Sequence, residues 1–422
     1  MLTAIVGINW GDEGKGRMVD LLSRDYDIIC RYQGGNNAGH TVVNDKGTFV
    51  LNLLPSGILR DGTVNVMGNG MVIDLAHLCG EIASLRDRGI SVTPENLVIS
   101  DKAIVCLPYH KLQDIMEEER LKDKKYGSTR RGIGPVYADK YIKKGLRMED
   151  LFDREALREK ISDLVEWKNL TVTGYGHAPV DPDEIFAWAI KYSEPLLPFI
   201  RDCTAYLTNA VRHEHKNVLF EAQLGALRDI DFGIYPYTSS STTLAAYAPI
   251  GAGIPFARLN RVTGIIKAYS TCVGEGPFTA ELFGEEAERL RKAGGEYGAA
   301  TGRPRRVGPF DVPASRYGVD AQGATELALT KLDVLSYMDK IPVVTAYDID
   351  GEITTDFPSG ARLLKAKPVI EYLQGFGDVS GCRSYSELNE NAKAYIKYIE
   401  NAMRCPIKYV SVGASREACI ML

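Results

Sequence analysis

The sequence has no hydrophobic run long enough to cross a membrane, and no basic-then-apolar leader at its start. A bilayer span needs about twenty consecutive apolar residues, and a secretory signal places positive charge ahead of an apolar stretch. The eight cysteines form no C-x-x-C pair, and the six histidines are dispersed. These absences argue against a membrane protein, a disulfide framework and a cysteine-based zinc site. They favour a cytoplasmic protein with reduced thiols.

A large excess of charge of one sign is also missing. The 422 residues include 50 Lys and Arg against 55 Asp and Glu, which gives a formal net charge of −5. A nucleic-acid partner gains no support from this balance, because proteins that bind nucleic acids concentrate positive charge. No linker rich in Pro, Gly or Ser and no internal repeat divides the chain. We therefore expect one domain over residues 1–422, with a helical insertion at about 150–213.

Apolar strand-like runs alternate with helix-like runs. Strands are expected at residues 3–8, 28–32, 64–67, 97–100, 218–221, 262–270, 342–347 and 407–412. Helices are expected at 14–24, 73–88, 109–122, 182–213, 285–293, 323–330 and 386–404, and residues 122–147 are expected to form a long basic loop. This alternation predicts an α/β fold with a mostly parallel central sheet flanked by helices on both faces. The fold would be like that of P-loop NTPases, with large helical and loop insertions and with ligands at the carboxyl ends of the strands.

A glycine-rich turn with a carboxylate and a lysine follows the first expected strand. It has the sequence Gly11-Asp12-Glu13-Gly14-Lys15-Gly16 and opens a helix. Such a turn can present backbone N–H groups and the positive end of the helix dipole to a phosphate. It is not a Walker A motif, because Gly16 stands where that motif has its magnesium-binding Ser or Thr. We expect Asp12 to replace that hydroxyl. A plain strand-to-helix turn, the alternative, would have no use for Asp12 and Lys15 together.

A second glycine-rich turn places one histidine close behind it. Residues 34–41 have the sequence Gly-Gly-Asn-Asn-Ala-Gly-His-Thr, and His40 is the one histidine of the chain in such a setting. Together the two turns predict phosphate chemistry on a nucleotide, with an acid and a base close by.

Three further segments suit the binding of a base or of an anion. In Thr330-Lys331-Leu332-Asp333, a carboxylate could accept both N–H groups on one edge of guanine; the alternative is an aspartate that caps a turn. Residues 298–306 place three arginines among glycines, which suits carboxylate or phosphate, although charge runs are usually solvated. Residues 127–135 combine hydroxyls, arginines and glycines, and either wrap a phosphate or form a flexible basic loop.

In this order and spacing, these segments resemble adenylosuccinate synthetase over residues 3–416. The family's opening signature is matched at residues 10–16 and its second at 35–41, and further matches lie at 131–135, 264–269, 301–306 and 330–335. The resemblance implies a GTP-dependent ligase of de novo AMP synthesis. It would form adenylosuccinate from IMP and L-aspartate through 6-phosphoryl-IMP, and would release GDP and phosphate. It also implies Mg²⁺ and a homodimer in which Lys143 reaches the partner's site.

The resemblance also implies roles for single residues. Asp12 would take the N1 proton of IMP, His40 would donate to the departing GDP, and Asp12 with the Gly39 carbonyl would bind Mg²⁺. The residues implied for GTP are Gly11, Asp12, Glu13, Gly14, Lys15, Gly16, Arg17, Gly39, His40, Thr41, Arg305, Lys331, Leu332, Asp333, Ser411, Val412 and Gly413. Those implied for IMP are Asp12, Lys15, Asn37, Ala38, Gly39, His40, Thr129, Lys143, Gln223, Leu224, Ser239 and Arg303. Those implied for aspartate are Ala299, Ala300, Thr301, Gly302, Arg303 and Arg305.

Several positions depart from the family pattern, mostly on the IMP side. Lys143 replaces an arginine, and Leu224 stands in place of a glutamine unless that glutamine is shifted to Gln223. The other departures are Ser239 and Ala300, each for a threonine, and Asn9 for a glutamine. Two alternatives therefore stay open: the same chemistry on another purine monophosphate such as dGMP, and a GTP-binding regulator without catalysis.

Overall fold

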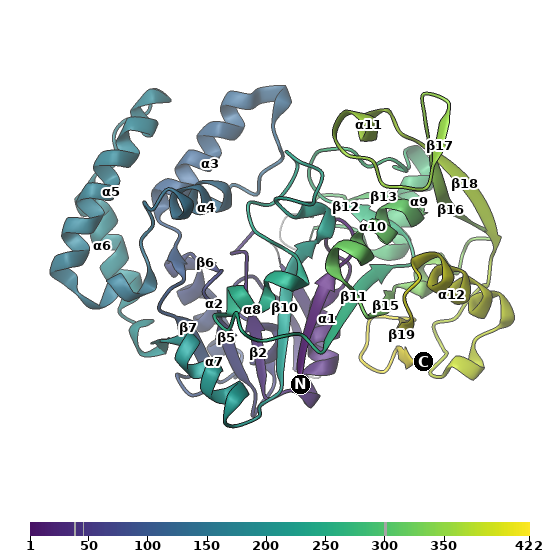
Figure 1. Cartoon of the computed structure of the whole chain (residues 1–422), viewed down its shortest axis with the longest axis horizontal. Helices are drawn as coiled ribbons and strands as arrows, with labels where there is room; N and C mark the ends of the chain where they lie inside the picture. The colour runs from purple at the N-terminus through teal and green to yellow at the C-terminus, as the bar shows by residue number, and fades with distance from the viewer. Residues whose placement is uncertain (38, 45, 299–301) are drawn as a thin grey trace.

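A ten-stranded sheet forms the centre of the computed structural model, which describes residues 1–37, 39–44, 46–298 and 302–422 (Figure 1). Its order is β20-β19-β15-β11-β1-β10-β2-β5-β7-β9. Neighbouring strands are parallel except at the β19–β20 pair, which is antiparallel. The strands are β1 (Leu2–Gly7), β2 (Ile28–Arg31), β5 (Val64–Met67), β7 (Leu97–Ser100), β9 (Ile200–Arg201), β10 (Val218–Gly225), β11 (Arg261–Lys267), β15 (Glu326–Thr330), β19 (Ile407–Ser411) and β20 (Cys419–Met421).

Helices cover both faces of this sheet, so successive side chains of a central strand are all buried. In β1, Ile5 belongs to the cluster that contains Met18 and Val19 of α1. Its neighbours Ala4 and Val6 point to the other face, into a cluster built on α7 and α8. Burial on both sides explains why such strands have continuous apolar sequences rather than alternating ones. The expected mostly parallel sheet with helices on both faces is confirmed.

The helices are α1 (Lys15–Leu22), α2 (Leu75–Asp87), α3 (Pro108–Leu121), α4 (Ile133–Tyr141), α5 (Arg154–Gly174), α6 (Pro182–Ser193), α7 (Cys203–Arg212), α8 (Ala248–Ala252), α9 (Gly284–Gly294), α10 (Val312–Gln322), α11 (Gly360–Lys365) and α12 (Glu390–Met403). The smaller strands are β3 (His40–Asn44), β4 (Gly47–Leu51), β6 (Val72–Ile73), β8 (Ile104–Val105), β12 (Ser270–Cys272), β13 (Arg306–Gly308), β14 (Phe310–Asp311), β16 (Lys340–Ile349), β17 (Glu352–Thr354) and β18 (Lys367–Gln374). No helix within the described ranges has the length and apolar character that a membrane span requires.

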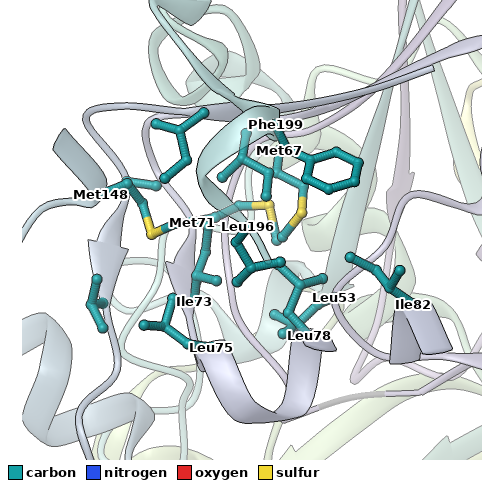
Figure 2. Close-up of a cluster of buried hydrophobic side chains, with 14 of the residues drawn as sticks. Leu53, Met67, Met71, Ile73, Leu75, Leu78, Ile82, Met148, Leu196 and Phe199 are labelled. Atoms are coloured by element: carbon teal, nitrogen blue, oxygen red, sulfur yellow. The ribbon is translucent and has the colours of Figure 1, made fainter. Parts of the chain in front are cut away.

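Helices α3, α4, α5 and α6 lie together to the left of the sheet in Figure 1. A large buried cluster joins this block to the sheet, and Figure 2 shows its centre. Met67 comes from β5, Met148 from the segment before α5, and Leu196 and Phe199 from the segment before β9. The helical block is therefore fixed to the sheet through a shared core.

The parallel arrangement brings functional loops from distant parts of the sequence to one edge of the sheet. The segments that follow β1, β2, β10, β11, β15 and β19 all leave from the carboxyl ends of adjacent parallel strands. Ligands of such sheets bind at this edge. The two glycine-rich turns and the Lys331–Asp333 segment meet there.

Three expectations about local structure are wrong. The helix expected at 182–213 is two helices, α6 and α7, because Pro195 and Pro198 interrupt it and β9 intervenes. The helix expected at 323–330 is instead the strand β15, since Gly323 ends α10 in a left-handed conformation. The long loop expected at 122–147 contains α4, which begins after Gly132, also left-handed.

Candidate active site

The phosphate-binding turn is held by a carboxylate inside it. Glu13 is buried, and its Oε1 accepts hydrogen bonds from the backbone N–H groups of Asn9 (3.1 Å) and Gly11 (2.8 Å). Its Oε2 accepts from Nζ of Lys15 at 2.8 Å. Gly11 and Gly14 have φ of 102° and 98°, which favours glycine. The glycines therefore allow an open turn that ends at Gly14, the N-cap of α1, and the Glu13 carboxylate holds this turn in place.

Asp12 occupies the exposed part of this turn. Its φ is 60°, a left-handed conformation that aspartate tolerates better than most residues. Its side chain is 30% exposed and forms an ion pair with Arg305, at 3.0 Å between Oδ2 and Nε. The phosphate-binding turn and the arginine-rich segment, far apart in the sequence, therefore meet at Asp12.

His40 lies directly beside the start of α1. It is the first residue of β3, and a Cβ added to Gly16 would lie 3.0 Å from the His40 Cβ. Lys15 lies close enough to contribute to the electrostatic potential at the imidazole. The imidazole therefore lies beside the first turn of α1, which follows the turn that carries Asp12.

A buried carboxylate, Glu221 of β10, orients the imidazole. The Nδ1 of His40 lies 2.5 Å from Oε1 of Glu221. The carboxylate also accepts from the backbone N–H of Ser56 (2.7 Å) and from its hydroxyl (2.6 Å). This pairing places the proton on Nδ1 and leaves Nε2 of His40 for chemistry. We did not predict this role for Glu221.

The electrostatics of the pair favour an ionised Glu221 and a neutral His40. Burial lowers the pKa of His40, although Glu221 opposes this effect. Burial alone would raise the pKa of Glu221, but His40, Arg31 and the Ser56 hydroxyl together lower it. An added negative charge near His40 would make the imidazole easier to protonate.

The segment expected to recognise guanine presents an unused carboxylate oxygen. Oδ1 of Asp333 is buried, and no donor among the described residues reaches it. Burial raises the pKa of Asp333. Lys331 has a φ of 59°, and Leu332 is fully buried, so Leu332 can offer only its backbone. The hydroxyl of Thr330 donates to the Glu13 carbonyl at 2.8 Å and connects this segment to the phosphate turn.

The last part of the expected GTP site lies next to this segment. The Arg17 guanidinium of α1 donates to the Ser411 hydroxyl and to the Ser415 carbonyl, the latter at 2.6 Å. Val412 is buried, and Gly413 accepts a hydrogen bond from Ser411 at 3.1 Å. Helix α1 thus connects the phosphate end of the expected site with its base end.

On the expected IMP side, Gln223 and not Leu224 makes the polar contacts. Nε2 of Gln223 donates to Oδ1 of Asn37 (3.1 Å) and to the Gly35 carbonyl (3.2 Å), while its Oε1 has no donor within the described residues. Leu224 has a φ of 64° and faces Gly11. Gln223 thus lies beside an asparagine implied for IMP.

The remaining candidates lie in β3 or in loops, and they are partly or fully exposed. Gly39 and Thr41 flank His40, and Ser239 lies 3.0 Å from Ser241 between hydroxyl oxygens. Arg303 pairs with Glu275 at 3.6 Å, and Glu275 also lies next to Gly127, close to the exposed Thr129. Gly302 is exposed. Four candidates, Ala38, Ala299, Ala300 and Thr301, lie outside the described residues.

Lys143 stands apart from the other candidates. It follows α4 with a φ of 65° and is exposed. Tyr141 and Ile142, directly before it, are 70% and 54% exposed. Large apolar side chains exposed side by side are typical of a protein–protein contact.

Two neighbouring arginines of the arginine-rich segment pair with different glutamates. Arg306 pairs with Glu281 and donates to the Gly276 carbonyl at 2.8 Å. Arg305 pairs both with Asp12 and with the buried Glu296. The sequence predicts that this segment binds an anion. It does not predict the roles of Glu281 and Glu296, because a glutamate outside a motif cannot be distinguished from any other glutamate.

With this geometry established, comparison with known proteins gives one family. The family model described as Adenylosuccinate synthetase matches residues 4–420. The chain is 44% identical over 424 residues to the adenylosuccinate synthetase of Caldanaerobacter subterraneus, covering 100% of the chain and 99% of the relative. It is 45% identical over 421 residues to that of Heliobacterium modesticaldum, covering 99% and 98%.

Solved structures agree. The structure of fully ligated adenylosuccinate synthetase from Plasmodium falciparum superimposes with a TM-score of 0.93 at 36% identity, over 100% of this chain and 99% of that one. The cyanophage S-2L succinoaminodeoxyadenylate synthetase, bound to dGMP and dATP, gives a TM-score of 0.63 at 20% identity, over 100% and 95%. This second likeness shows a shared fold alone.

Proposed function

The chain belongs to the adenylosuccinate synthetase family and is a GTP-dependent ligase of IMP and L-aspartate, and we propose that Asp12 and His40 are its base and acid. One observation carries these roles: the imidazole and the turn that bears Asp12 border the same region at the start of α1. The helix N-terminus between them suits a phosphoryl group in transfer.

Asp12 has the chemistry and the access of a general base. Its carboxylate is partly exposed at the rim of the phosphate turn. Removal of the N1 proton of IMP makes O6 nucleophilic, so that O6 attacks the γ-phosphate of GTP and forms 6-phosphoryl-IMP. The amine of aspartate then displaces phosphate from C6. Arg305, which pairs with Asp12, releases it when IMP and aspartate bind.

His40 supplies the opposite function. Glu221 holds its Nδ1, so Nε2 faces the region beside α1. Charge accumulates on the departing GDP, and a protonated imidazole offsets that charge. The triphosphate itself raises the proton affinity of His40, which counteracts the effect of burial.

Mg²⁺ fits the donor set of this site. Asp12 offers a carboxylate and Gly39 a backbone carbonyl, and both are oxygen donors, which Mg²⁺ prefers beside substrate phosphates. When bound, Mg²⁺ would neutralise charge on the phosphates. We assign Asp12 and Gly39 as its protein ligands.

The remaining roles follow position and chemistry. The buried Oδ1 of Asp333 suits the N–H groups of guanine, with Lys331, Ser411 and Gly413 beside it. Asn37 and Gln223 form the amide pair for IMP. Arg303 and Arg305 suit the carboxylates of aspartate.

IMP is favoured over dGMP as the purine. Relatives at 44–45% identity over nearly the full length are adenylosuccinate synthetases, whereas the enzyme bound to dGMP shares 20%. We also propose a homodimer, supported by the exposed Tyr141 and Ile142 beside Lys143. A cytoplasmic location is supported by the eight free cysteines.

The test is to form adenylosuccinate from IMP, aspartate, GTP and Mg²⁺ and to follow its absorbance, with Asp12→Asn as the variant. Asparagine keeps the left-handed backbone at this position, so the variant should keep the wild-type melting temperature. Turnover should fall about 10²–10⁴-fold. Retained turnover would remove Asp12 from the mechanism. A preference for dGMP over IMP in the same assay would overturn the choice of purine.

A further inference from the structure

One buried carboxylate, Glu296, lies where three segments of the site meet. Its side chain is 0% exposed. Its Oε1 accepts from Nζ of Lys331 (2.9 Å), Nζ of Lys267 (3.0 Å) and the hydroxyl of Tyr269 (2.5 Å). Its Oε2 accepts from Nη1 of Arg305 at 2.7 Å. Both oxygens therefore accept hydrogen bonds from other residues of the protein.

The partners of Glu296 come from different parts of the fold. Lys267 is the last residue of β11, and Lys331 follows β15. Arg305 belongs to the arginine-rich segment and contacts Asp12. The Arg305 backbone N–H also donates to the Glu296 carbonyl at 2.9 Å, so this pair closes the base of the segment between them. The Glu296 side chain thus contacts both Arg305, assigned to aspartate, and Lys331, assigned to guanine.

Glu296 acts through its partners, because it is inaccessible to substrates. Arg305 and Lys331 keep 17% and 33% of their side chains exposed. Glu296 holds Nη1 of Arg305 and, together with the Gly294 carbonyl at 2.6 Å, Nζ of Lys331. A change at Glu296 therefore reaches the substrates only as a change in where these two cations point.

The charges at this junction make the carboxylate essential to its partners. Burial alone would raise the pKa of Glu296, but Lys267, Lys331 and Arg305 lower it well below its ordinary value, so it stays ionised. Burial lowers the pKa of Lys267 to about 8, and Glu296 opposes that shift. An uncharged side chain at this position would leave three cations without their shared counter-ion.

We propose that Glu296 is a positioning residue that sets Arg305 and Lys331 from one carboxylate and so tunes the aspartate and GTP sites together. The inference rests on the proposed roles of Arg305 and Lys331. It predicts a signature that a purely structural residue would not give: two Michaelis constants rise together, while the chemical step changes less.

The test is Glu296→Gln, with KM measured for each substrate in turn. We expect KM for aspartate and KM for GTP each to rise about tenfold or more, the effect of losing a charge-assisted hydrogen bond. The KM for IMP should change least, because Gln223 donates to Asn37 and Gly35 and, within the described residues, neither Asn37 nor Gln223 hydrogen-bonds to Glu296 or its partners. Glu296→Asp keeps the charge with a shorter reach, so it should fold and raise the same two constants by less.

Glu281→Gln is the matched control. Glu281, whose side chain is 18% exposed, holds another arginine of this segment, Arg306, which also donates to the Gly276 carbonyl at 2.8 Å. In this variant, the KM values for IMP, aspartate and GTP should stay within about twofold of those of the wild type, which is below the effect of one lost charged contact.

Three outcomes would overturn the proposal: a rise in only one of the two constants, a fall in kcat alone, or equal effects in Glu281→Gln. If Glu296→Gln fails to fold, Glu296→Asp decides by the same criteria. Failure of the proposed base would instead appear as activity in Asp12→Asn, measured in the same assay, so the two results are separable.

Discussion

At the scale of single residues, buried carboxylates hold several of the cations and the imidazole that we assign to the substrates. Glu13 holds Lys15, Glu221 holds His40, and Glu296 holds Lys331 and Arg305. A buried charge is stable only when it is paired and hydrogen-bonded. The pairing also restricts the rotamers of the outward side chain, so the site is organised before ligands arrive.

Glu221→Gln tests this arrangement at the acid. We expect kcat to fall about a hundredfold or more, with KM for IMP nearly unchanged, because the imidazole loses its orienting charge. Without Glu221, the pKa of His40 drops further, since the carboxylate raises it in the wild type. The alkaline limb of the kcat–pH profile should therefore move to lower pH.

Glu326→Gln is the control for that variant. Glu326 is also a buried glutamate of the central sheet and accepts from the Thr263 hydroxyl at 2.7 Å, but it begins β15 at the opposite edge. Its kcat and pH profile should match those of the wild type. If both variants lost activity equally, the effect would come from the sheet and not from His40.

Asp311 allows a prediction about stability and pH. It caps α10 and accepts from the Tyr347 hydroxyl at 2.7 Å, and burial raises its pKa from 3.8 to about 6. The folded state therefore binds its proton more tightly than the unfolded state does, so this group favours folding below pH 4 and loses that contribution as pH rises through 6.

Asp311→Asn removes this titration. Between pH 7 and pH 4, the stability of the wild type should improve relative to that of the variant by about 2 kcal/mol. Melting temperatures of both proteins, measured across this range, give the difference, in which the other titrating groups cancel. A difference that is constant with pH would show that Asp311 titrates normally.

At the scale of elements, helix α10 packs tightly against the end of β1, the strand that precedes the phosphate turn. A Cβ added to Gly318 would lie 2.0 Å from the Ile8 carbonyl oxygen, whereas one added to Gly80, within α2, would meet nothing within 4 Å. Both glycines lie inside helices, where alanine is intrinsically favoured by about 0.5–1 kcal/mol. The two positions therefore differ only in packing.

Gly318→Ala should destabilise the protein by about 1–3 kcal/mol through overpacking, and it should reduce activity because Ile8 leads into the turn of Asp12. Gly80→Ala should raise stability slightly and leave activity unchanged. Denaturant unfolding and turnover measure both effects. Equal stability changes in the two variants would mean that α10 can move away from β1 without consequence.

The helices and strands could be predicted from the sequence where hydrophobic patterns or glycines restrict the backbone conformation. The continuous apolar runs of β1, β2 and β10 and the glycines of the first turn identified both the sheet and its binding edge. The strand β15 was wrongly expected as helix, because Leu327-Ala328-Leu329 suits either structure and only burial on both faces decides. Glu221 and Glu296 escaped prediction for the same reason, since their roles depend on contacts with residues distant in the sequence.

At the scale of the whole molecule, the parallel sheet brings segments that are distant in the sequence together in one site. Segments more than three hundred residues apart meet because their strands are neighbours, as Thr330 and Glu13 show. The division into a single domain with a helical insertion stays a prediction. Lys143 lies just beyond the end of α4.

A mixed-subunit experiment tests whether Lys143 completes the site of a partner. Asp12→Asn damages a subunit's own site, and Lys143→Ala would damage only the partner's site. Each variant alone should be nearly inactive. In an equal mixture about half of the dimers are mixed, and one of the two sites in each has both residues intact, so about one quarter of wild-type activity should return.

The recovery must also depend on association. Ile142→Glu, introduced into both variants, places a charge on the exposed apolar pair Tyr141 and Ile142. Desolvating that charge opposes dimer formation, so the mixture should stay inactive and sedimentation should show monomers. If the simple mixture shows no recovery while each variant remains folded, Lys143 serves its own subunit or none. The site would then be complete within one chain. Positive charge for the phosphate of IMP would have to come from residues of the same chain, such as Arg303 and Arg305.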